Sequence, residues 1–308
     1  MNAQQTSIIV GACTFRRPDG LRALLTSLAA LHCPDDVDLE IVIVDNDETP
    51  SAQTLLRSIG PTLPFACRYE HEPRPGISQA RNRMLTESQN ADFLLFVDDD
   101  ETVDPDLVAQ HLRIQRKTKA TFVQGPCVMT VKDPSDEWWL QTAFFKQKTF
   151  PDGASRHESW SNNVLIDMGF VTEHNLRFDE MLGYAGGEDT VFFQDIIRAG
   201  GTGAFAAKAV VREVQLESRL TWDWALKRQY RYGVTRANTQ LLRRPKLKAM
   251  AWCLPRAVVM ITLGALIGLS VVFKGKRGLA NGAALIARGG GLVMGAIGFR
   301  ADEYARPT

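Results

Sequence analysis

Residues 93–101 read FLLFVDDDE, an apolar run that ends in four consecutive acids. The apolar part has the length and bulk of a buried strand. Four acids at a strand end repel one another unless a cation neutralises them. Closely spaced carboxylate oxygens suit Mg²⁺ or Mn²⁺, whose coordination shell phosphate oxygens and water would complete. Because alternate residues of an extended segment point the same way, Asp98 and Asp100 are predicted to face one site. A solvated acidic turn is the alternative.

The segments on either side of this stretch alternate between strand and helix patterns. Before it, the predicted strands are Ser7–Cys13, Leu39–Val44 and Phe65–Tyr69, and the predicted helices are Asp19–Leu31, Ser51–Ile59 and Ile77–Ser88. After it, the predicted helices are Asp104–Lys117, Trp138–Phe145 and Glu188–Ala199, and the predicted strands are Thr121–Thr130 and Gly203–Val211. This order predicts an α/β fold with a mostly parallel sheet, helices on both faces and ligands beyond the carboxyl ends of the strands.

The composition is that of a folded protein. Of the 308 residues, 45% are apolar and 23% are charged, which excludes a disordered, collagen-like or coiled-coil chain. The five cysteines form no CxxC pair, the five histidines have no zinc-ligand spacing, and residues 1–6 lack the apolar core of a signal peptide. We therefore expect reduced thiols, a cytoplasmic location and carboxylate ligands for any bound metal.

Charge is distributed unevenly along the chain. Residues 1–206 carry 18 basic and 30 acidic side chains, whereas residues 207–308 carry 18 basic and 5 acidic ones. A basic tail of this kind is typical of contact with an anionic surface, either nucleic acid or phospholipid. Since the same tail is strongly apolar, it favours a membrane surface and no nucleic acid.

The tail contains a long basic helix from Trp222 and then seventeen uncharged residues, Ala257–Phe273. At ~1.5 Å per residue this run spans roughly 26 Å, slightly less than the ~30 Å hydrocarbon core of a bilayer. A second apolar stretch, Leu279–Phe299, carries Arg288 and six glycines, which suits close packing of helices. Two crossings would leave the cations of residues 274–277 on the far side, so a shallow hairpin or interfacial pair is predicted. Buried helices of a soluble domain are the alternative.

Further charged side chains lie where a nucleotide site would need them. Asp45 ends the second predicted strand, where it can accept a base N–H or simply start a turn. Arg81, near a helix start, can be an ordinary charge on the helix surface or can supply counter-charge to a diphosphate. Asp189 lies in the first turn of its helix, where the macrodipole favours the ionised form that a general base requires, and where a merely helix-stabilising acid would also lie. Arg228 and Arg231 share one helix face, suited to a diphosphate or to a membrane surface.

Together these residues resemble those of the family 2 inverting glycosyltransferases, whose catalytic domain has the GT-A fold, a Rossmann-like nucleotide half joined to an acceptor half. The exopolysaccharide enzymes of the succinoglycan type look similar. The resemblance covers about Thr6 to Thr235. The matching elements are Cys13-Thr14, Val44-Asp45-Asn46, Gly76 with Ala80-Arg81-Asn82, the Asp98-Asp99-Asp100 version of DxD, Phe178-Asp179-Glu180 and Gly187-Glu188-Asp189.

The resemblance implies a role for each matching residue. Asp189 would take the proton from an acceptor hydroxyl as it attacks the anomeric carbon from behind, which inverts the configuration. A divalent metal, Mg²⁺ or Mn²⁺, would be held by Asp98 and Asp100. The nucleotide sugar would be bound by Thr14, Asp45, Arg81, Asp98 and Asp99, with Arg228 and Arg231 at the diphosphate. The acceptor wall would contain Trp138, Trp160, Asn162 and Glu188, although core packing would explain the tryptophans equally well.

The function that follows is transfer of one sugar from a nucleotide-diphosphate sugar, expected to be a UDP-sugar, to a hydroxyl of a lipid-linked saccharide acceptor in cell-surface polysaccharide synthesis. The QxxRW motif of processive synthases is present only as Arg228-Gln229-Tyr230-Arg231-Tyr232, so a polymer is not expected. Residues 1–220 would form the catalytic domain, with halves 1–103 and 104–220. Residues 221–308 would hold it at the cytoplasmic face of the inner membrane.

Two other functions are weighed against this one. A catalytically inactive, membrane-bound sugar-binding scaffold would be expected to lack metal or base residues, yet Asp100 and Asp189 are both present. A sugar-phosphate nucleotidyltransferase would carry a glycine-rich loop after its first strand, whereas residues 10–17 contain one glycine.

Overall fold

The computed structural model describes residues 5–146, 148–182 and 186–299. The chain divides into two compact units. The first comprises residues 1–128, 148–184 and 188–213, and the second comprises residues 129–147, 185–187 and 214–308. The predicted boundary at residue 220 thus differs from the observed division, because residues 129–147 pack with the C-terminal helices and not with the sheet that surrounds them in sequence.

The first unit is built on a mixed sheet. Its strands are β1 (Thr6–Thr14), β2 (Val37–Asp45), β3 (Ala66–His71), β4 (Phe93–Asp98), β6 (Phe122–Gln124), β8 (Ser155–Arg156), β9 (Val164–Asp167) and β10 (Gly203–Phe205). Their order is β3-β2-β1-β4-β9-β6-β10-β8. The first four strands pair in parallel, but β9 is antiparallel to both β4 and β6. The sequence missed β9 because its four residues show no alternation of polar and apolar side chains.

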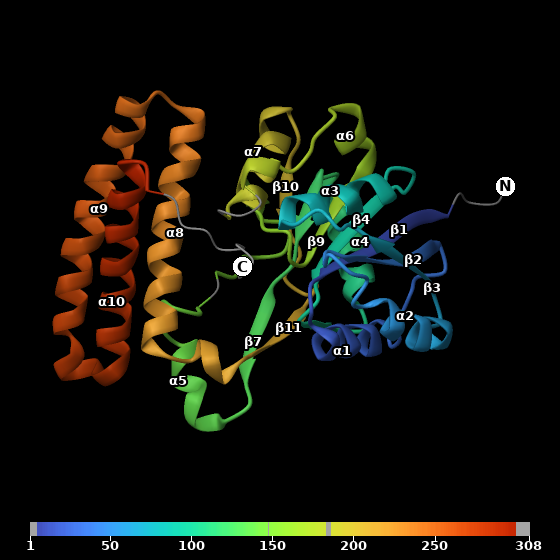
Figure 1. The fold of residues 1–308 in the computed structure, drawn as a ribbon, viewed down its shortest axis with the longest axis horizontal. Helices are drawn as coiled ribbons and strands as arrows, with labels where there is room; N and C mark the ends of the chain where they lie inside the picture. The colour runs from blue at the N-terminus through green and yellow to red at the C-terminus, as the bar shows by residue number, and fades with distance from the viewer. Residues whose placement is uncertain (1–4, 147, 183–185, 300–308) are drawn as a thin grey trace. The chain divides into compact units, whose positions relative to one another are not determined.

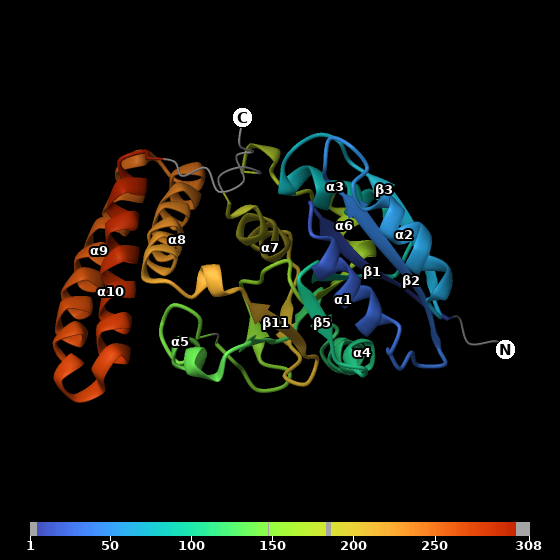
Figure 2. The ribbon, with the colours of Figure 1, turned by 60° about the horizontal axis from the view of Figure 1, so that its bottom comes forward.

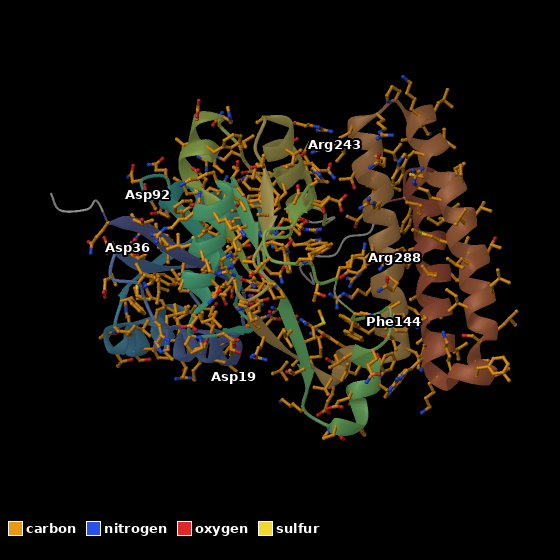
Figure 3. The ribbon with its side chains drawn as sticks, turned by 180° about the vertical axis from the view of Figure 1, so that it is seen from behind. Asp19, Asp36, Asp92, Phe144, Arg243 and Arg288 are labelled. Carbon is orange, nitrogen blue, oxygen red and sulfur yellow. The ribbon has the colours of Figure 1, made fainter. Side chains whose placement is uncertain are left out.

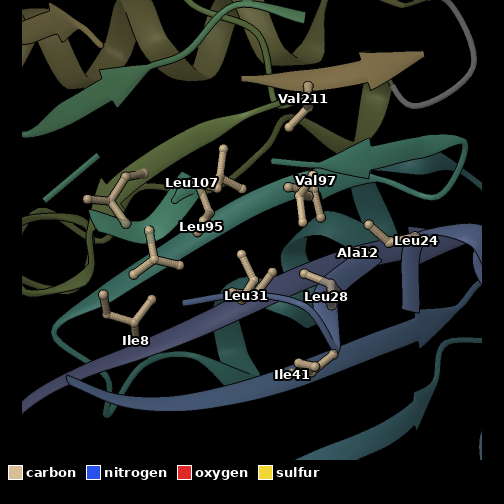
Figure 4. Packing of buried hydrophobic residues seen from close by; sticks show 14 of the residues in the cluster. Ile8, Ala12, Leu24, Leu28, Leu31, Ile41, Leu95, Val97, Leu107 and Val211 are labelled. Carbon is tan, nitrogen blue, oxygen red and sulfur yellow. The ribbon is translucent and has the colours of Figure 1, made fainter. Parts of the chain in front are cut away.

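Helices cover both faces of this sheet (Figure 1). They are α1 (Pro18–Leu28), α2 (Gln53–Ile59), α3 (Ile77–Glu87), α4 (Leu107–Thr118), α6 (Met168–Glu173) and α7 (Glu188–Arg198). Successive side chains of a strand point to opposite faces. Accordingly, Ile8 of β1 packs with α1, α2 and α4, whereas Ile9 packs with α3, α6 and α7. Figure 2 shows α1 and α4 on one side of the sheet, and Figure 4 shows the core beneath them, in which Leu24, Leu28 and Ile41 belong to one cluster. The predicted three-layer α/β arrangement is confirmed.

A smaller sheet, ordered β5-β11-β7, contains β5 (Glu101–Val103), β7 (Cys127–Val131) and β11 (Val211–Gln215). Two predicted strands are therefore wrong in extent: Thr121–Thr130 is divided into β6 and β7, and Gly203–Val211 into β10 and the start of β11. The first break falls at Gly125-Pro126. Proline has no N–H to donate, and a Cβ on Gly125 would lie 2.1 Å from the carbonyl oxygen of Ala209.

The second unit contains the long helices α8 (Trp222–Arg243), α9 (Lys246–Leu269) and α10 (Val271–Ala296), with α10 between the other two (Figure 1). Glycines of α10 permit this close approach. A Cβ on Gly291 would lie 1.9 Å from the carbonyl oxygen of Tyr230 on α8, and one on Gly282 would lie 2.5 Å from that of Gly264 on α9. The predicted packing through glycines is confirmed. Figure 3 marks Arg288 of α10, whose Nε donates a hydrogen bond to Gln229 Oε1 on α8 at 3.0 Å.

An aromatic cluster ties residues 129–147 to these helices. The predicted helix Trp138–Phe145 is shorter than expected, since α5 covers only Glu137–Leu140 and the following residues turn so that their rings pack together. The ring of Trp139 lies 5.9 Å from that of Phe144 and 5.6 Å from that of Trp222 at the start of α8.

Short 3₁₀ helices cover Gly60–Thr62, Pro134–Asp136, Glu180–Leu182 and Glu217–Arg219.

Candidate active site

The carboxyl ends of neighbouring strands bring Thr14, Asp45 and Asp98 to one edge of the sheet. In the register of β1, Thr14 pairs with Asp45 of β2, and Cys13 pairs with Asp98 of β4. Because β2 and β4 lie on opposite sides of β1, the strand order reverses there, which is the position at which open α/β sheets bind ligands. The structure thus brings these strand ends together as predicted.

The acids that follow β4 form a turn. The guanidinium of Arg17 contacts both Asp99 and Asp100, at 3.0 and 2.9 Å, and Asp99 also accepts a hydrogen bond from Thr14 Oγ1 at 2.8 Å. Strand alternation does not explain how Asp98 and Asp100 could face one site, because the strand ends at Asp98 and residues 99 and 100 are a turn. That the two carboxylates share a site stays a prediction. The two carboxylates are nevertheless close enough for the charge of Asp100 to raise the pKa of Asp98.

Asp98 has lost much of its hydration. Burial raises the pKa of Asp98 to about 7, the charge of Arg81 opposes this rise, and the charge of Asp100 adds to it. Glu101, which is 1% exposed, lies beside it, and burial together with the charge of Asp98 raises the pKa of Glu101 well above its usual range. The Glu101 carboxylate accepts hydrogen bonds from the Asp98 N–H at 2.9 Å and from Asn162 Nδ2 at 3.2 Å. The end of β4 therefore concentrates carboxylates whose mutual repulsion favours a bound cation.

Arg81 connects this strand end to the helix that carries the predicted base. It lies on α3, is 9% exposed, and forms an ion pair with Glu188, which is 3% exposed at the start of α7. The charge of Arg81 also opposes the rise in pKa of both Asp98 and Asp189. Because Glu188 directly precedes Asp189, this ion pair places Arg81 at the first turn of α7. That the end of β4 and the first turn of α7 form one site stays a prediction.

Asp189 is more difficult to ionise than the sequence suggested. Burial raises the pKa of Asp189 to about 7, and the charge of Glu188 adds to this rise. One of its oxygens accepts a hydrogen bond from the N–H of Thr190 at 2.6 Å. The helix macrodipole was expected to favour the ionised form, but that effect amounts to ~0.3–1 kcal/mol, whereas desolvation of a buried charge costs roughly several kcal/mol. Burial therefore dominates, and Asp189 takes up a proton near neutral pH.

Asp45 is held by donors from the protein itself. The residue is fully buried, and one of its oxygens accepts hydrogen bonds from the Ala52 N–H at 2.7 Å and from the Tyr69 hydroxyl at 3.0 Å. By strand alternation, it lies on the face of the sheet covered by α1 and α2, whereas Asp98 lies on the face covered by α3 and α7. In this structure Asp45 orders the loop after β2, and its contact with a nucleotide base stays a prediction.

The predicted acceptor residues fall in different surroundings. Trp160 is 45% exposed and is available to a ligand, whereas Asn162 is bonded to Glu101. Glu188 does not form an exposed wall, because it is buried against Arg81, and its position suits holding that arginine in place.

Three predicted site residues belong to the second unit. Trp138 packs on Trp139 with ring centroids 4.2 Å apart, which supports the core-packing interpretation of this tryptophan. The guanidinium of Arg228 donates a hydrogen bond to the Tyr232 hydroxyl at 2.7 Å, and Arg231 lines a groove described below. The participation of Arg228, Arg231 and Trp138 in nucleotide or acceptor binding stays a prediction.

The residues present fit a divalent cation that takes part of its ligands from a substrate. Within residues 5–146, 148–182 and 186–299, no group of three or more His, Cys, Asp or Glu side chains is arranged to hold a metal by itself. The donors at the end of β4 are carboxylates, the hard ligands that Mg²⁺ and Mn²⁺ prefer, and mainly burial, with a contribution from neighbouring acids, raises the pKa values of Asp98 and Glu101. Asp98 and Asp100 would therefore hold the ion together with phosphate oxygens and water.

The sequence interpretation missed Arg17. This residue lies one turn beyond β1, next to Arg16, which has a left-handed backbone conformation with φ of 53°. The sequence contained a sign of this contact. Arg16 and Arg17 follow β1, and the acids from Asp98 onward follow β4, its parallel neighbour, so both groups lie at the same edge of the sheet. Arg17 supplies the main visible counter-charge to Asp99 and Asp100.

We predict that the Arg81–Glu188 pair is needed for stability. Arg81→Met leaves a buried carboxylate without its cation, which costs about 3–5 kcal/mol and lowers the unfolding temperature by roughly 6–20 °C. Thermal unfolding followed by circular dichroism measures this change. The double variant Arg81→Met/Glu188→Met should regain most of the loss, because the buried carboxylate that pairs with Arg81 is removed as well. A double variant as unstable as Arg81→Met alone would contradict the pairing.

Comparison with known proteins gives a consistent result. The sequence model of the family described as "Glycosyl transferase family 2" matches residues 7–176. The succinoglycan biosynthesis protein ExoM of Rhizobium meliloti (strain 1021) is 39% identical over 230 residues, which are 74% of this chain and 73% of that protein.

Solved structures resemble the fold at low sequence identity. The crystal structure of GalNAc-T7 with UDP, GalNAc and Mn²⁺ has a TM-score of 0.56 and 16% identity, and the match covers 77% of this chain and 51% of that one. This chain therefore spans about half the length of that protein. The crystal structure of S. aureus TarS residues 1–349 in complex with UDP has a TM-score of 0.49 and 13% identity over 93% of this chain and 90% of that one.

Proposed function

Because the chain belongs to glycosyl transferase family 2 and is a glycosyltransferase with the GT-A fold, we propose that it transfers one sugar from a UDP-sugar to a hydroxyl of a lipid-linked saccharide acceptor, with inversion, in exopolysaccharide synthesis. The observation that carries the proposal is the position of Arg81, whose charge acts on Asp98 at the end of β4 and on Asp189 at the start of α7. This supports one site, in which Asp98 serves the donor and Asp189 serves the acceptor.

The reaction is a single displacement. The acceptor hydroxyl oxygen attacks the anomeric carbon, the bond from that carbon to the diphosphate oxygen breaks, and its electron pair leaves with UDP. Asp189 takes the hydroxyl proton, and its raised pKa of about 7 makes it a stronger base than an ordinary aspartate once ionised. Attack from the face opposite the departing diphosphate inverts the configuration at that carbon.

On the donor side, Asp98 and Asp100 would hold the divalent cation. Such an ion offsets the negative charge that develops on the departing diphosphate. Other side chains prepare the surroundings of this cation. Thr14 and Arg17 orient Asp99 through hydrogen bonds, and Arg81 keeps positive charge near the end of β4. Preorganised charges of this kind need no rearrangement when the diphosphate leaves.

Binding measurements test this proposal directly. The full chain in detergent should be stabilised by at least one UDP-sugar in the presence of Mn²⁺, and a ligand at 100 times its Kd adds about 2.7 kcal/mol to apparent stability. A screen of UDP-sugars by thermal unfolding, with and without Mn²⁺, reads out this effect. Transfer of the labelled sugar to a lipid extract then identifies the acceptor class. If no UDP-sugar stabilises the chain and no label reaches lipid, the proposed function is wrong.

The outer side of α9 supports membrane association. Lys246–Leu269 is long and apolar enough to cross a membrane, which by itself is weak evidence. Its exposed side chains from Val258 onward are uncharged, and Leu263 and Leu266 are 47% and 61% exposed. Lys246 and Lys248 precede this stretch, and Lys274, Lys276 and Arg277 follow it. An apolar face with basic ends suits an anionic membrane, and the proposed location is its cytoplasmic face.

We predict that Leu263→Asp/Leu266→Asp releases the protein from membranes. Each exposed leucine buried in lipid contributes about 1.5–3 kcal/mol, so losing two lowers the partition coefficient by roughly 10²–10⁴-fold. Co-sedimentation with phosphatidylglycerol vesicles measures the change. Leu216→Asp is the matched control, because Leu216 is 52% exposed and lies outside α9 and its flanking lysines, and it should sediment as wild type does. Undiminished sedimentation of the double variant would rule out this face as the anchor.

A further inference from the structure

The second unit contains a groove of about 700 Å³ that the catalytic proposal does not use. It is lined by residues of α8 and α10. Trp224 and Tyr230 of α8 form part of one wall, and Ala283 and Ala287 of α10 form part of the other. The alanines leave space that larger side chains would fill. The volume and the lining of this groove are typical of a small-molecule site, because such sites measure ~300–1,000 Å³ and are mostly apolar with a few polar groups.

The polar groups of this groove are cations. Lys227 and Arg231 both line it, and because they are four residues apart on α8, they lie on one side of that helix. Among the described residues that line the groove, none is acidic. Asp223 contacts Lys227 at 2.9 Å, but both side chains are more than 70% exposed. An exposed pair of this type is worth about 0–1 kcal/mol, so an incoming phosphate can replace the aspartate with little loss.

An apolar groove with two neighbouring cations suits a ligand that joins one long hydrocarbon chain to a strongly anionic head. A diphosphate carries more negative charge than the single phosphodiester of a bilayer phospholipid, and it matches a pair of cations, one of them an arginine able to bind two oxygens at once.

We propose that this groove binds the lipid diphosphate that carries the acceptor saccharide: the hydrocarbon chain lies along Trp224, Tyr230, Ala283 and Ala287, and the diphosphate contacts Lys227 and Arg231. The inference rests on the proposed function in taking the acceptor to be lipid-linked. It assigns Arg231 to the lipid of the acceptor, in place of the departing nucleotide diphosphate expected from sequence. No covalent step occurs in the groove, which holds the acceptor at a set distance from the membrane.

Photo-cross-linking of the full wild-type chain tests the location. The probe is farnesyl diphosphate with a diazirine on its chain, added to the protein in detergent, and labelled peptides are identified by mass spectrometry. Label is expected in residues 224–231 and 283–287. Unlabelled farnesyl diphosphate should suppress it, whereas phosphatidylglycerol bicelles at the same lipid concentration should not. Label confined to residues 258–273 of α9, or equal suppression by phosphatidylglycerol, overturns the proposal, the latter by identifying a site for bulk phospholipid.

Variants test the chemistry. Ala287→Trp fills the groove, and Lys227→Gln removes a cation; each should raise the Kd of farnesyl diphosphate at least about tenfold. Ala265→Trp and Lys248→Gln are matched controls, because both residues are exposed on α9 outside the groove, and they should leave that Kd unchanged. Unchanged affinity in both groove variants overturns the proposal. If Ala287→Trp fails to fold, the cross-linked positions in the wild-type chain still decide.

Failure of this inference and failure of the proposed function are distinguishable. Stabilisation of the wild-type chain by a UDP-sugar with Mn²⁺ reports on the first unit and requires no lipid. If that stabilisation is observed while farnesyl diphosphate leaves the groove peptides unlabelled, the groove assignment is wrong and the transferase assignment stands. If the groove peptides are labelled and no UDP-sugar stabilises the chain, the groove assignment stands and the transferase assignment is wrong.

Discussion

Asp189→Asn is expected to lower kcat for sugar transfer by roughly 10²–10⁴-fold, the usual contribution of a positioned general base. The substitution keeps the size of the side chain but removes its ability to accept the hydroxyl proton. The Kd of the UDP-sugar should remain within a few fold of the wild-type value, because the loss falls on the chemical step. Steady-state kinetics and calorimetry on the same preparation separate the two quantities.

The matched control is Asp195→Asn. Asp195 lies two turns along the same helix and contacts Arg198 at 3.2 Å, with both side chains partly exposed to solvent. Its replacement tests for a general effect of removing a carboxylate from α7 and should leave kcat within about twofold of wild type, as is usual for surface substitutions. If Asp189→Asn turned over normally, or if the control were equally impaired, Asp189 would not be the base.

The pH dependence of the wild-type enzyme provides a second readout for Asp189. Burial raises its pKa to about 7, so the carboxylate is protonated and inactive at lower pH and becomes an active base as the pH rises through that value. At saturating Mn²⁺, kcat should therefore increase from pH 6 to pH 8. The residual activity of Asp189→Asn should lack this rise. A wild-type rate that falls over the same interval would contradict the assignment.

Asp100→Ala is expected to weaken UDP binding in the presence of Mn²⁺ by at least about 10²-fold. Changing a residue that only hydrogen-bonds to a metal ligand already lowers metal affinity about 10–100-fold, and loss of a ligand itself should cost at least as much. The carboxylate is partly exposed, so its loss leaves the core intact, and Arg17 keeps its contact with Asp99. Calorimetry with UDP, with and without Mn²⁺, measures the effect. In the absence of the ion, wild type and variant should bind UDP equally weakly.

Asp106→Asn serves as the control for this experiment. Asp106 directly precedes α4, its side chain is 64% exposed, and it contacts the exposed ring of His32 at 2.9 Å. It should bind UDP with Mn²⁺ as tightly as wild type. Wild-type affinity that does not respond to Mn²⁺ would show that the carboxylates after β4 do not serve a metal-bound diphosphate.

Local sequence patterns predicted the elements that frame the site. The strands before residue 100 were placed to within two residues at each end, because a buried strand between helices needs a short apolar run, and such runs are visible in sequence. The position of Asp98 at a strand end and of Asp189 in a first helical turn follow from the same patterns. The strand β9 escaped detection, since four residues carry too little periodicity, and its antiparallel direction depends on neighbours in space.

The sequence by itself determined the α/β order, the carboxylates at the strand end and the basic, apolar tail, because each of these depends on residues close together in the chain. Tertiary structure alone decided which charges meet. Arg17 contacts Asp99 and Asp100, which lie 82 and 83 positions further along the chain, and Arg81 contacts Glu188, at a separation of 107 positions. Tertiary structure also decided the proton affinity of Asp98 and Asp189, since the cost of burying a charge is set by every element packed around it, and no stretch of sequence carries that information.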